Sequence, residues 1–212
     1  MTAPSRLKKP HPDSSGSYPD SRGVCIAIEF ATFTLQRRAE VSGMHRSELD
    51  LERKMWVIPE ERAKGRVEHL VPLSNRAVAL IREALRLHDR RRKGEGQFVF
   101  PSPRSNDKPI SPGALSHAMT DITAALALDD LTLHDLRRTG ATRIAALGVA
   151  PFIVSKVLAH KDGGGGAAIT ARHDNLYAYA DEKRDALNRW AVRLEALLGL
   201  AAADENASRK AA

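Results

Sequence analysis

The chain has 212 residues, of which 33 are Lys or Arg and 26 are Asp or Glu, giving a formal net charge of +7. This length suits one domain with a full hydrophobic core and leaves little room for a second. The basic balance favours a polyanionic partner, and nucleic acid is the first candidate. The single Cys25 excludes an intrachain disulfide framework and a cysteine-rich zinc site, and it fits a reducing cytoplasm.

The ends of the chain differ in composition from its middle. Residues 1–23 are rich in Pro, Ser and charge without periodicity, which predicts a flexible leader. Residues 201–212 are expected to form a flexible tail, with one folded domain at 24–200 between them. No apolar run approaches the ~20 residues that span a bilayer, and no signal pattern opens the chain. We therefore expect a soluble, cytoplasmic protein without a membrane partner.

The periodicity predicts mostly helices. Residues 26–44 have a helical pattern, and residues 56–74 are typical of two strands joined by a turn at Lys64-Gly65. The next helix starts with Asn75 as its cap, and another starts with Ser111 followed by a first-turn proline. Further helices are expected at residues 134–147, 150–159 and 180–200. The predicted fold class is mainly α with a small antiparallel β-sheet, an α+β arrangement.

An arginine lies within the apolar stripe of the first predicted helix. A helical wheel places Arg37 inside this stripe and Arg38 outside it. The stripe is formed by Ile26, Phe30, Phe33, Val41 and Met44. A guanidinium on the buried side needs an anion. One interpretation is an internal salt bridge to Glu40, and the other is a phosphate clamp, because the planar fork of arginine suits phosphate.

A second cluster lies in LTLHDLRRTGATRIAALGV, residues 131–149. Thr132 can cap a helix whose buried stripe is formed by Leu136, Gly140, Ile144 and Leu147. His134 and Arg137 flank that stripe one turn apart, so both can contact one phosphate. The same pair also fits a solvated helix face.

Two further basic residues, Lys64 and His160, also allow both a structural and a functional interpretation. Lys64 lies in the predicted hairpin turn, where a lysine beside glycine is usually plain solvated surface. His160 follows the apolar helix FIVSKVLA and precedes a run of four glycines. It can cap that helix and interact with its dipole, or it can act at a site.

Taken in order, four segments resemble the catalytic domain of the tyrosine recombinases, the phage integrase family. TLQRRAEVSGMHRSELDL resembles the first-arginine motif and ERAKGRVEHLVPLS the lysine hairpin. LHDLRRTGATRIAALGV resembles the His-x-x-Arg box, and VSKVLAHKD the segment with the second histidine. The resemblance runs from about Val24 to Leu197 and is far more specific than any single motif.

The resemblance implies strand exchange in double-stranded DNA, without metal or cofactor, through a 3′-phosphotyrosyl intermediate. Arg37 and Arg137 would stabilise the transition state, His134 and His160 would assist by hydrogen bonding and proton transfer, and Lys64 would protonate the leaving oxygen. These five side chains are predicted to converge on one basic cleft.

Two positions depart from the family pattern. Leu35 replaces the usual glycine and is expected to extend the preceding helix. The nucleophile position falls on Asp174, or on Thr170 with a shorter loop, and neither is tyrosine. An aspartate would give a labile acyl phosphate and would repel the phosphate.

The tyrosines that remain are Tyr177 and Tyr179. Tyr177 lies 17 residues after His160, and the glycine run could supply the extra loop length. The alternative is that both tyrosines pack the start of the last helix.

Three functions stay open: an integrase, a catalytically silent DNA-binding remnant, and a type IB topoisomerase, which the spacing of HDLRRTG disfavours. Family members place a core-binding domain before this one, and only the leader precedes it here, so weak, salt-dependent DNA binding is expected. The last helix carries an apolar stripe of Leu187, Trp190, Leu194 and Leu197. It is predicted to pack on its own domain or to dock on a second copy, giving a homo-oligomer on DNA.

Overall fold

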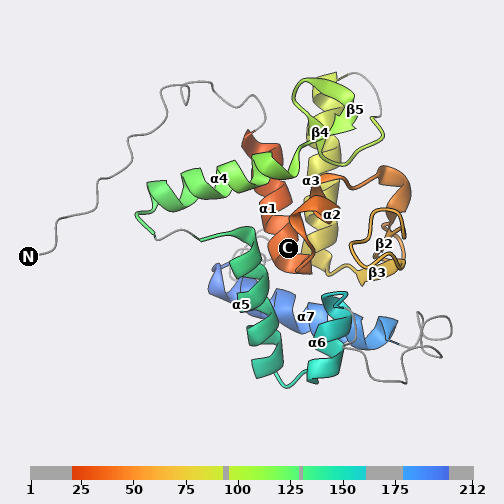
Figure 1. The fold of residues 1–212 in the computed structure, drawn as a ribbon, viewed down its shortest axis with the longest axis vertical. Helices are drawn as coiled ribbons and strands as arrows, with labels where there is room; N and C mark the ends of the chain where they lie inside the picture. The colour runs from red at the N-terminus through yellow and green to blue at the C-terminus, as the bar shows by residue number, and fades with distance from the viewer. Residues whose placement is uncertain (1–20, 93–95, 129–130, 161–178, 201–212) are drawn as a thin grey trace, which may run out of the picture.

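The computed structural model describes residues 21–92, 96–128, 131–160 and 179–200. Helices dominate it, as the fold class predicted (Figure 1). The helices, including one short 3-10 turn called η1, are α1 Ser21–Thr34, α2 Arg38–Ser42, η1 Arg46–Glu48, α3 Asn75–Arg92, α4 Pro112–Ala125, α5 Leu133–Ala146, α6 Pro151–Val157 and α7 Ala180–Leu197. α1 thus begins slightly before the expected start of the core at Val24.

The strands form two small antiparallel sheets rather than the single sheet predicted. The larger has the order β1-β2-β3 and the smaller pairs β4 with β5. The strands are β1 Leu49–Asp50, β2 Met55–Ile58, β3 His69–Pro72, β4 Pro101–Ser102 and β5 Ser105–Pro109. β2 and β3 are the two strands predicted around Lys64, with Trp56 opposite Val71 and Ile58 opposite His69.

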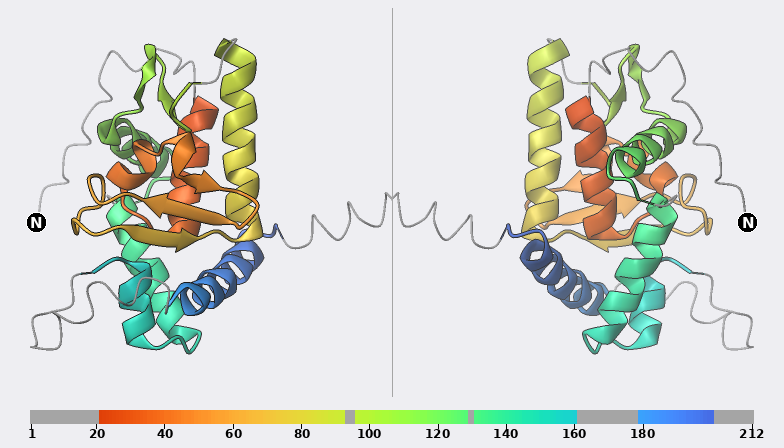
Figure 2. Two further views of the ribbon diagram at one scale, coloured as in Figure 1. Left: turned by 90° about the vertical axis from the view of Figure 1, so that its right-hand side faces the viewer. Right: turned by 90° about the vertical axis from the view of Figure 1, so that its left-hand side faces the viewer.

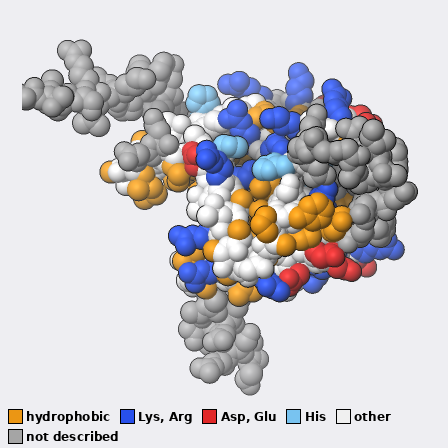
Figure 3. Space-filling model, turned by 60° about the horizontal axis from the view of Figure 1, so that its bottom comes forward, with side chains coloured by type: hydrophobic (Ala, Val, Ile, Leu, Met, Phe, Trp, Pro, Cys, Tyr) orange, Lys and Arg blue, Asp and Glu red, His pale blue; other side chains and the backbone are white. Residues whose placement is uncertain are grey.

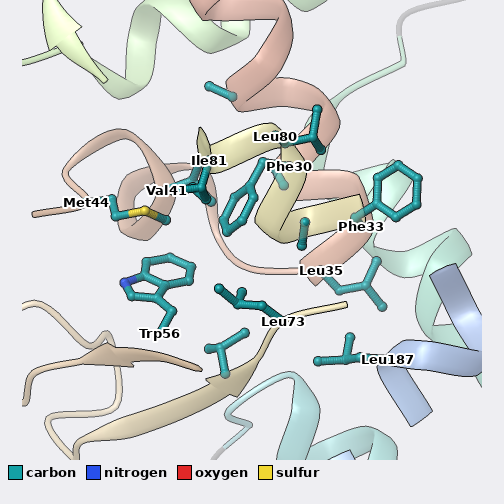
Figure 4. Close-up of a cluster of buried hydrophobic side chains, with 14 of the residues drawn as sticks. Phe30, Phe33, Leu35, Val41, Met44, Trp56, Leu73, Leu80, Ile81 and Leu187 are labelled. Carbon is teal, nitrogen blue, oxygen red and sulfur yellow. The ribbon is translucent and has the colours of Figure 1, made fainter. Parts of the chain in front are cut away.

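The core is built around α1, which contacts α3, α4, α5 and α7. Its residues Ile26, Phe30 and Phe33 are fully buried or nearly so, as the apolar stripe requires. The Phe30 ring packs against Trp56 of β2 with centroids 5.7 Å apart (Figure 4). Helix and sheet are therefore joined through aromatic contacts in one continuous core.

The prediction of one helix over residues 26–44 is wrong, because the helix is interrupted at Leu35. α1 ends at Thr34, and Leu35 has φ 57°, the left-handed region that favours glycine. Leu35 therefore ends the helix instead of extending it, and its side chain is fully buried in the core (Figure 4). The glycine that the family usually places here would adopt the same backbone conformation without strain.

The predicted caps are mostly confirmed. The Ser111 hydroxyl accepts a hydrogen bond from the Ala114 N–H at the start of α4. Thr132 caps α5 in a capping box with Asp135. The predicted cap at Asn75 is wrong by one residue: the Ser74 hydroxyl accepts from the Ala77 N–H, and Asn75 is the first residue of α3.

The last helix packs on its own domain. α7 contacts α6, β3, α5 and α1, and it lies beneath the larger sheet in Figure 2. Leu187, Trp190 and Leu194 are buried, and the Trp190 indole donates to the Thr32 carbonyl at 2.9 Å. Leu197 was expected in the same stripe, but it is 58% exposed because the helix ends beyond the core. None of the described helices has the length and apolar character to cross a membrane.

Candidate functional site

Arg37 occupies the N-cap position of α2, two residues after Leu35. Its main-chain N–H donates to Glu40 Oε2 at 2.9 Å, and its Nη1 donates to Glu40 Oε1 at 3.1 Å. Its Nη2 donates to the Ala159 carbonyl at 3.3 Å. The internal salt bridge weighed from the sequence is therefore present. The Arg37 side chain is still 23% exposed and has further N–H groups, so the ion pair leaves it able to contact a phosphate.

The sequence predicts that Arg137 flanks the buried face of α5. In the structure, Arg137 is part of that face. It is 6% exposed, and its guanidinium donates to the carbonyls of Leu35 and Leu158. Burial, followed by the nearby charge of Arg37, lowers the pKa of Arg137 to about 10. The group is still cationic at neutral pH, so a partly desolvated positive charge lies beside Arg37.

His160 is placed by the way α6 ends. The His160 N–H bonds the Ser155 carbonyl and the Ala159 N–H bonds the Lys156 carbonyl, which together form a Schellman cap. Burial lowers the pKa of His160, and Arg137, Arg37 and His134 lower it further through their positive charges. The exposed ring is therefore neutral near pH 7 and can exchange a hydrogen bond or a proton with a ligand.

The structure brings together four of the predicted residues, which we call the basic cluster: Arg37, His134, Arg137 and His160. His134 is exposed in the first turn of α5, one turn before Arg137. Figure 3 shows histidines gathered among Lys and Arg side chains on one face of the molecule. Such a concentration of positive charge and N–H donors suits a phosphate group.

Lys64 is not joined to the basic cluster. It is exposed in the loop between β2 and β3, and no contact within the described part of the chain links it to the other four. Its role stays a prediction. Tyr177, Asp174 and Thr170 lie outside the described residues.

Tyr179 is the one candidate tyrosine within the described ranges, and it packs against α6. Its ring meets Phe152 edge-on with centroids 5.1 Å apart, and the Lys156 ammonium lies 4.8 Å from the Phe152 centroid. Tyr179 is the N-cap residue of α7, and its carbonyl accepts from the Lys183 N–H at 2.9 Å. For Tyr179, these contacts agree with the interpretation that it packs the start of the last helix.

The sequence did not predict the main-chain carbonyls that accept hydrogen bonds from the arginines and hold them in place. Arg37, Arg137 and Gln36 all donate to carbonyls of the consecutive residues 157–159 at the end of α6. His69 of β3 is buried next to the same segment. Main-chain acceptors carry no side-chain signal, and an inward-facing strand residue is ordinarily interpreted as core.

Two hollows of the surface lie away from the basic cluster. Two adjoining hollows of about 430 and 300 Å³ share Lys54 and Asn75 and lie between the β1–β2 turn, α3 and α7. No residue of the basic cluster lines them, so we place the site by its hydrogen bonds and charges. Across the described residues, no group of three or more His, Cys, Asp or Glu side chains could hold a metal ion.

Comparison with curated proteins finds prophage integrases. The chain is 28% identical over 163 residues to the prophage integrase IntA of Escherichia coli K12, covering 77% of this chain and 37% of that protein. It is 30% identical over 176 residues to the prophage integrase IntZ of the same organism, covering 82% and 40%. The chain thus spans about two fifths of the length of these relatives.

Solved structures show the same fold. The integrase from mycobacterium phage Brujita matches with a TM-score of 0.61 and 16% identity, over 89% of this chain and 60% of that chain. The lambda integrase catalytic core matches with a TM-score of 0.52 and 21% identity, over 68% and 84%. A model of the Phage integrase family matches residues 15–165. This match covers more than half of the chain, so the chain belongs to the phage integrase family, the tyrosine recombinases.

Proposed function

We propose that this chain is the catalytic domain of a site-specific recombinase that binds double-stranded DNA at the basic cluster. The observation that carries the proposal is the approach of Arg37 and Arg137 to each other and to His160, at the end of α6. Two guanidiniums held at one place by main-chain carbonyls can share the non-bridging oxygens of one phosphodiester.

The proposed reaction uses protein side chains alone. A tyrosine hydroxyl attacks the phosphorus, and the bond to the 5′-oxygen breaks, which leaves a 3′-phosphotyrosyl link and a free 5′-hydroxyl. Arg37 and Arg137 offset the negative charge of the pentavalent transition state. His134 and His160 hydrogen-bond the phosphate or move the tyrosine proton, and Lys64 gives a proton to the leaving 5′-oxygen.

Whether the chain has a tyrosine nucleophile distinguishes two candidate functions, an enzyme and a silent DNA-binding remnant. Asp174 and Thr170, which align with the nucleophile position, are not tyrosine, and the ring of Tyr179 is engaged by Phe152 and Lys156. Tyr177 is the remaining candidate. Without it the same cluster would bind DNA but form no covalent link, which is the second candidate function, a silent DNA-binding remnant.

The experiment that separates them is a denaturing gel of the chain incubated with nicked suicide duplexes made from the DNA that flanks its gene. Covalent adduct from the unmodified chain that disappears in Tyr177→Phe supports the enzyme with Tyr177 as nucleophile. Adduct formed only by Asp174→Tyr supports the remnant with an intact site. If Arg137→Ala leaves either adduct unchanged, the basic cluster is not the phosphate site.

We also propose that α7 contributes to assembly on DNA. Leu197 and Leu198 at its end are 58% and 53% exposed, although the rest of the apolar stripe is buried on its own domain. Exposed leucines at a helix end can pack on a second copy. Sedimentation of the chain with duplex should show a complex with more than one copy, and Leu197→Lys with Leu198→Lys should reduce it to one copy.

A further inference from the structure

The loop between β2 and β3 carries Lys64 directly after a tight turn. We call residues 59–68 the lysine loop. The N–H groups of Arg62 and Ala63 both donate to the Pro59 carbonyl at 3.0 Å, which forms the turn. Ala63 is buried, whereas Lys64, the next residue, is exposed. The position of the lysine therefore depends on what holds the turn before it.

Arg62, in that turn, forms a two-point ion pair with Glu48. Its Nε donates to Oε1 at 2.7 Å and its Nη2 donates to Oε2 at 2.8 Å. The Glu48 side chain is 8% exposed and also accepts from the indole of the buried Trp56 at 2.9 Å. A two-point pair fixes the direction of a guanidinium as well as its charge. The pair therefore anchors the turn to the core.

The same guanidinium reaches α2. Arg62 Nη2 also donates to the Glu40 carbonyl at 3.2 Å. The Glu40 carboxylate accepts from Arg37, at 2.9 Å from the main chain and 3.1 Å from the side chain. Glu40 thus binds one arginine with its carboxylate and the other with its carbonyl. These hydrogen bonds join the turn before Lys64 to the residue that holds Arg37.

Gly43, at the end of α2, leaves room for the Arg62 side chain. A Cβ atom added there would lie 2.6 Å from Arg62 Nη1 and 3.4 Å from the Ala39 carbonyl. Gly43 has φ −89° and ψ 15°, a conformation that alanine can adopt. Gly43→Ala should therefore displace the end of the Arg62 side chain while the charge of the arginine remains.

We infer that Arg62 is a positioning residue for Lys64. Through Glu48 and the Glu40 carbonyl, it holds the turn of the lysine loop against α2. Lys64 thereby keeps a fixed place relative to Arg37, from which it can protonate the leaving 5′-oxygen. The inference rests on the proposed function for this proton transfer, whereas the anchoring of the loop is independent of it. The alternative is that Arg62 only stabilises the fold.

The test uses the full chain with two substitutions and two matched controls. Arg62→Met removes the guanidinium, and Gly43→Ala displaces it. Arg76→Met is the control for the first, because Arg76 forms another partly buried pair, with Glu29, between α3 and α1. Gly113→Ala, in α4, is the control for the second.

The first readout is amide hydrogen exchange without DNA. The Ala63 N–H donates to Pro59, and the Arg66 N–H donates to the Ala63 carbonyl at 2.9 Å. Arg62→Met and Gly43→Ala should speed exchange of these two amides at least about tenfold relative to the amides of α5, which report on the whole fold. The two controls should leave this ratio unchanged. If neither Arg62→Met nor Gly43→Ala changes it, the inference is wrong.

The second readout is the rate of covalent adduct formation on two nicked suicide duplexes. They differ only in the 5′-bridging atom of the cleaved phosphate, which is oxygen in one and sulfur in the other. A thiol has a pKa of about 8.5, so sulfur can leave without a proton, whereas oxygen needs one. The rates are measured in whichever form of the chain makes adduct, unmodified or Asp174→Tyr.

Arg62→Met should slow adduct formation on the oxygen duplex about a hundredfold and on the sulfur duplex less than about tenfold. Gly43→Ala should change the rates in the same direction, Lys64→Met should match Arg62→Met, and Arg37→Ala should slow both duplexes. An equal loss on both duplexes in Arg62→Met would mean that the arginine only stabilises the fold.

The outcomes separate the inference from the proposed function. If Lys64→Met shows the loss specific to oxygen and Arg62→Met does not, the inference alone is wrong. If the loop amides respond while no form of the chain makes adduct on either duplex, the anchoring of the loop stands and the proposed function fails. Should Arg62→Met not fold, Gly43→Ala decides by both readouts.

Discussion

The packing of Leu35 against Gly140 joins the break after α1 to the helix that carries Arg137. A Cβ atom added at Gly140 would lie 2.3 Å from Leu35 Cδ2, 3.2 Å from Cδ1 and 3.3 Å from Cγ. Leu35 is fully buried, so its side chain has no free space into which it could rotate. Gly140→Ala should therefore displace the leucine whose carbonyl accepts from Arg137.

Two opposing effects determine how much Gly140→Ala changes the free energy of unfolding. Overpacking a buried contact costs about 1–3 kcal/mol, and here the clash involves three atoms of one enclosed side chain. Replacing a helical glycine by alanine gains about 1 kcal/mol in helix propensity. The net expectation is that Gly140→Ala does not stabilise the fold and lowers the free energy of unfolding by up to about 2 kcal/mol.

In a chain that carries Leu35→Ala, Gly140→Ala should change the free energy of unfolding in the opposite direction. Leu35→Ala alone should cost about 2–4 kcal/mol as a cavity mutation. In that background, Gly140→Ala fills part of the vacated space and should stabilise by up to about 1 kcal/mol. Urea unfolding followed by circular dichroism measures all four forms. Gly113→Ala in α4 is the control, since its added Cβ would meet only Ser111 Oγ at 3.7 Å. The reasoning is refuted if Gly140→Ala stabilises the wild type as much as Gly113→Ala does.

Three further predictions concern single side chains. Ala159 has φ 46°, so Ala159→Gly should raise the free energy of unfolding by about 1 kcal/mol, measured by urea unfolding. An unchanged or lower value would contradict the strained cap. Glu40→Gln should cost about 2 kcal/mol, because the buried carboxylate accepts twice from Arg37. A loss below about 0.5 kcal/mol would show that the pair is not structural. His69 has a folded-state pKa of about 3 against 6.5 unfolded, so protons bind the unfolded chain preferentially as the pH falls below 6.5. Stability should therefore drop by about 2 kcal/mol from pH 7 to pH 5, and this difference should be absent in His69→Phe.

Much of the fold follows from local chemistry that the sequence displays. Ser111 and Thr132 mark helix starts because their hydroxyls can accept from N–H groups without partners. The stripes of α1 and α7 predict burial because apolar residues recur at the helical period. His134 and Arg137 are one turn apart on α5, so their proximity also follows from spacing.

The rest depends on contacts that no local pattern carries. The apolar stripe continues past Leu35 as if the helix did, and only the left-handed φ of that residue, matched by the missing side chain at Gly140, ends it. Arg137 was expected beside the buried face, but the carbonyls of Leu35 and Leu158 allow its guanidinium to be buried within it.

A crystal structure of the chain bound to a nicked duplex tests the central claim most directly. The account predicts one phosphate of the DNA backbone within about 3 Å of N–H groups of both Arg37 and Arg137, with His160 beside it. The account would be contradicted by a duplex bound on another face, such as the one between α3 and α7, with Arg37 and Arg137 making no contact to DNA.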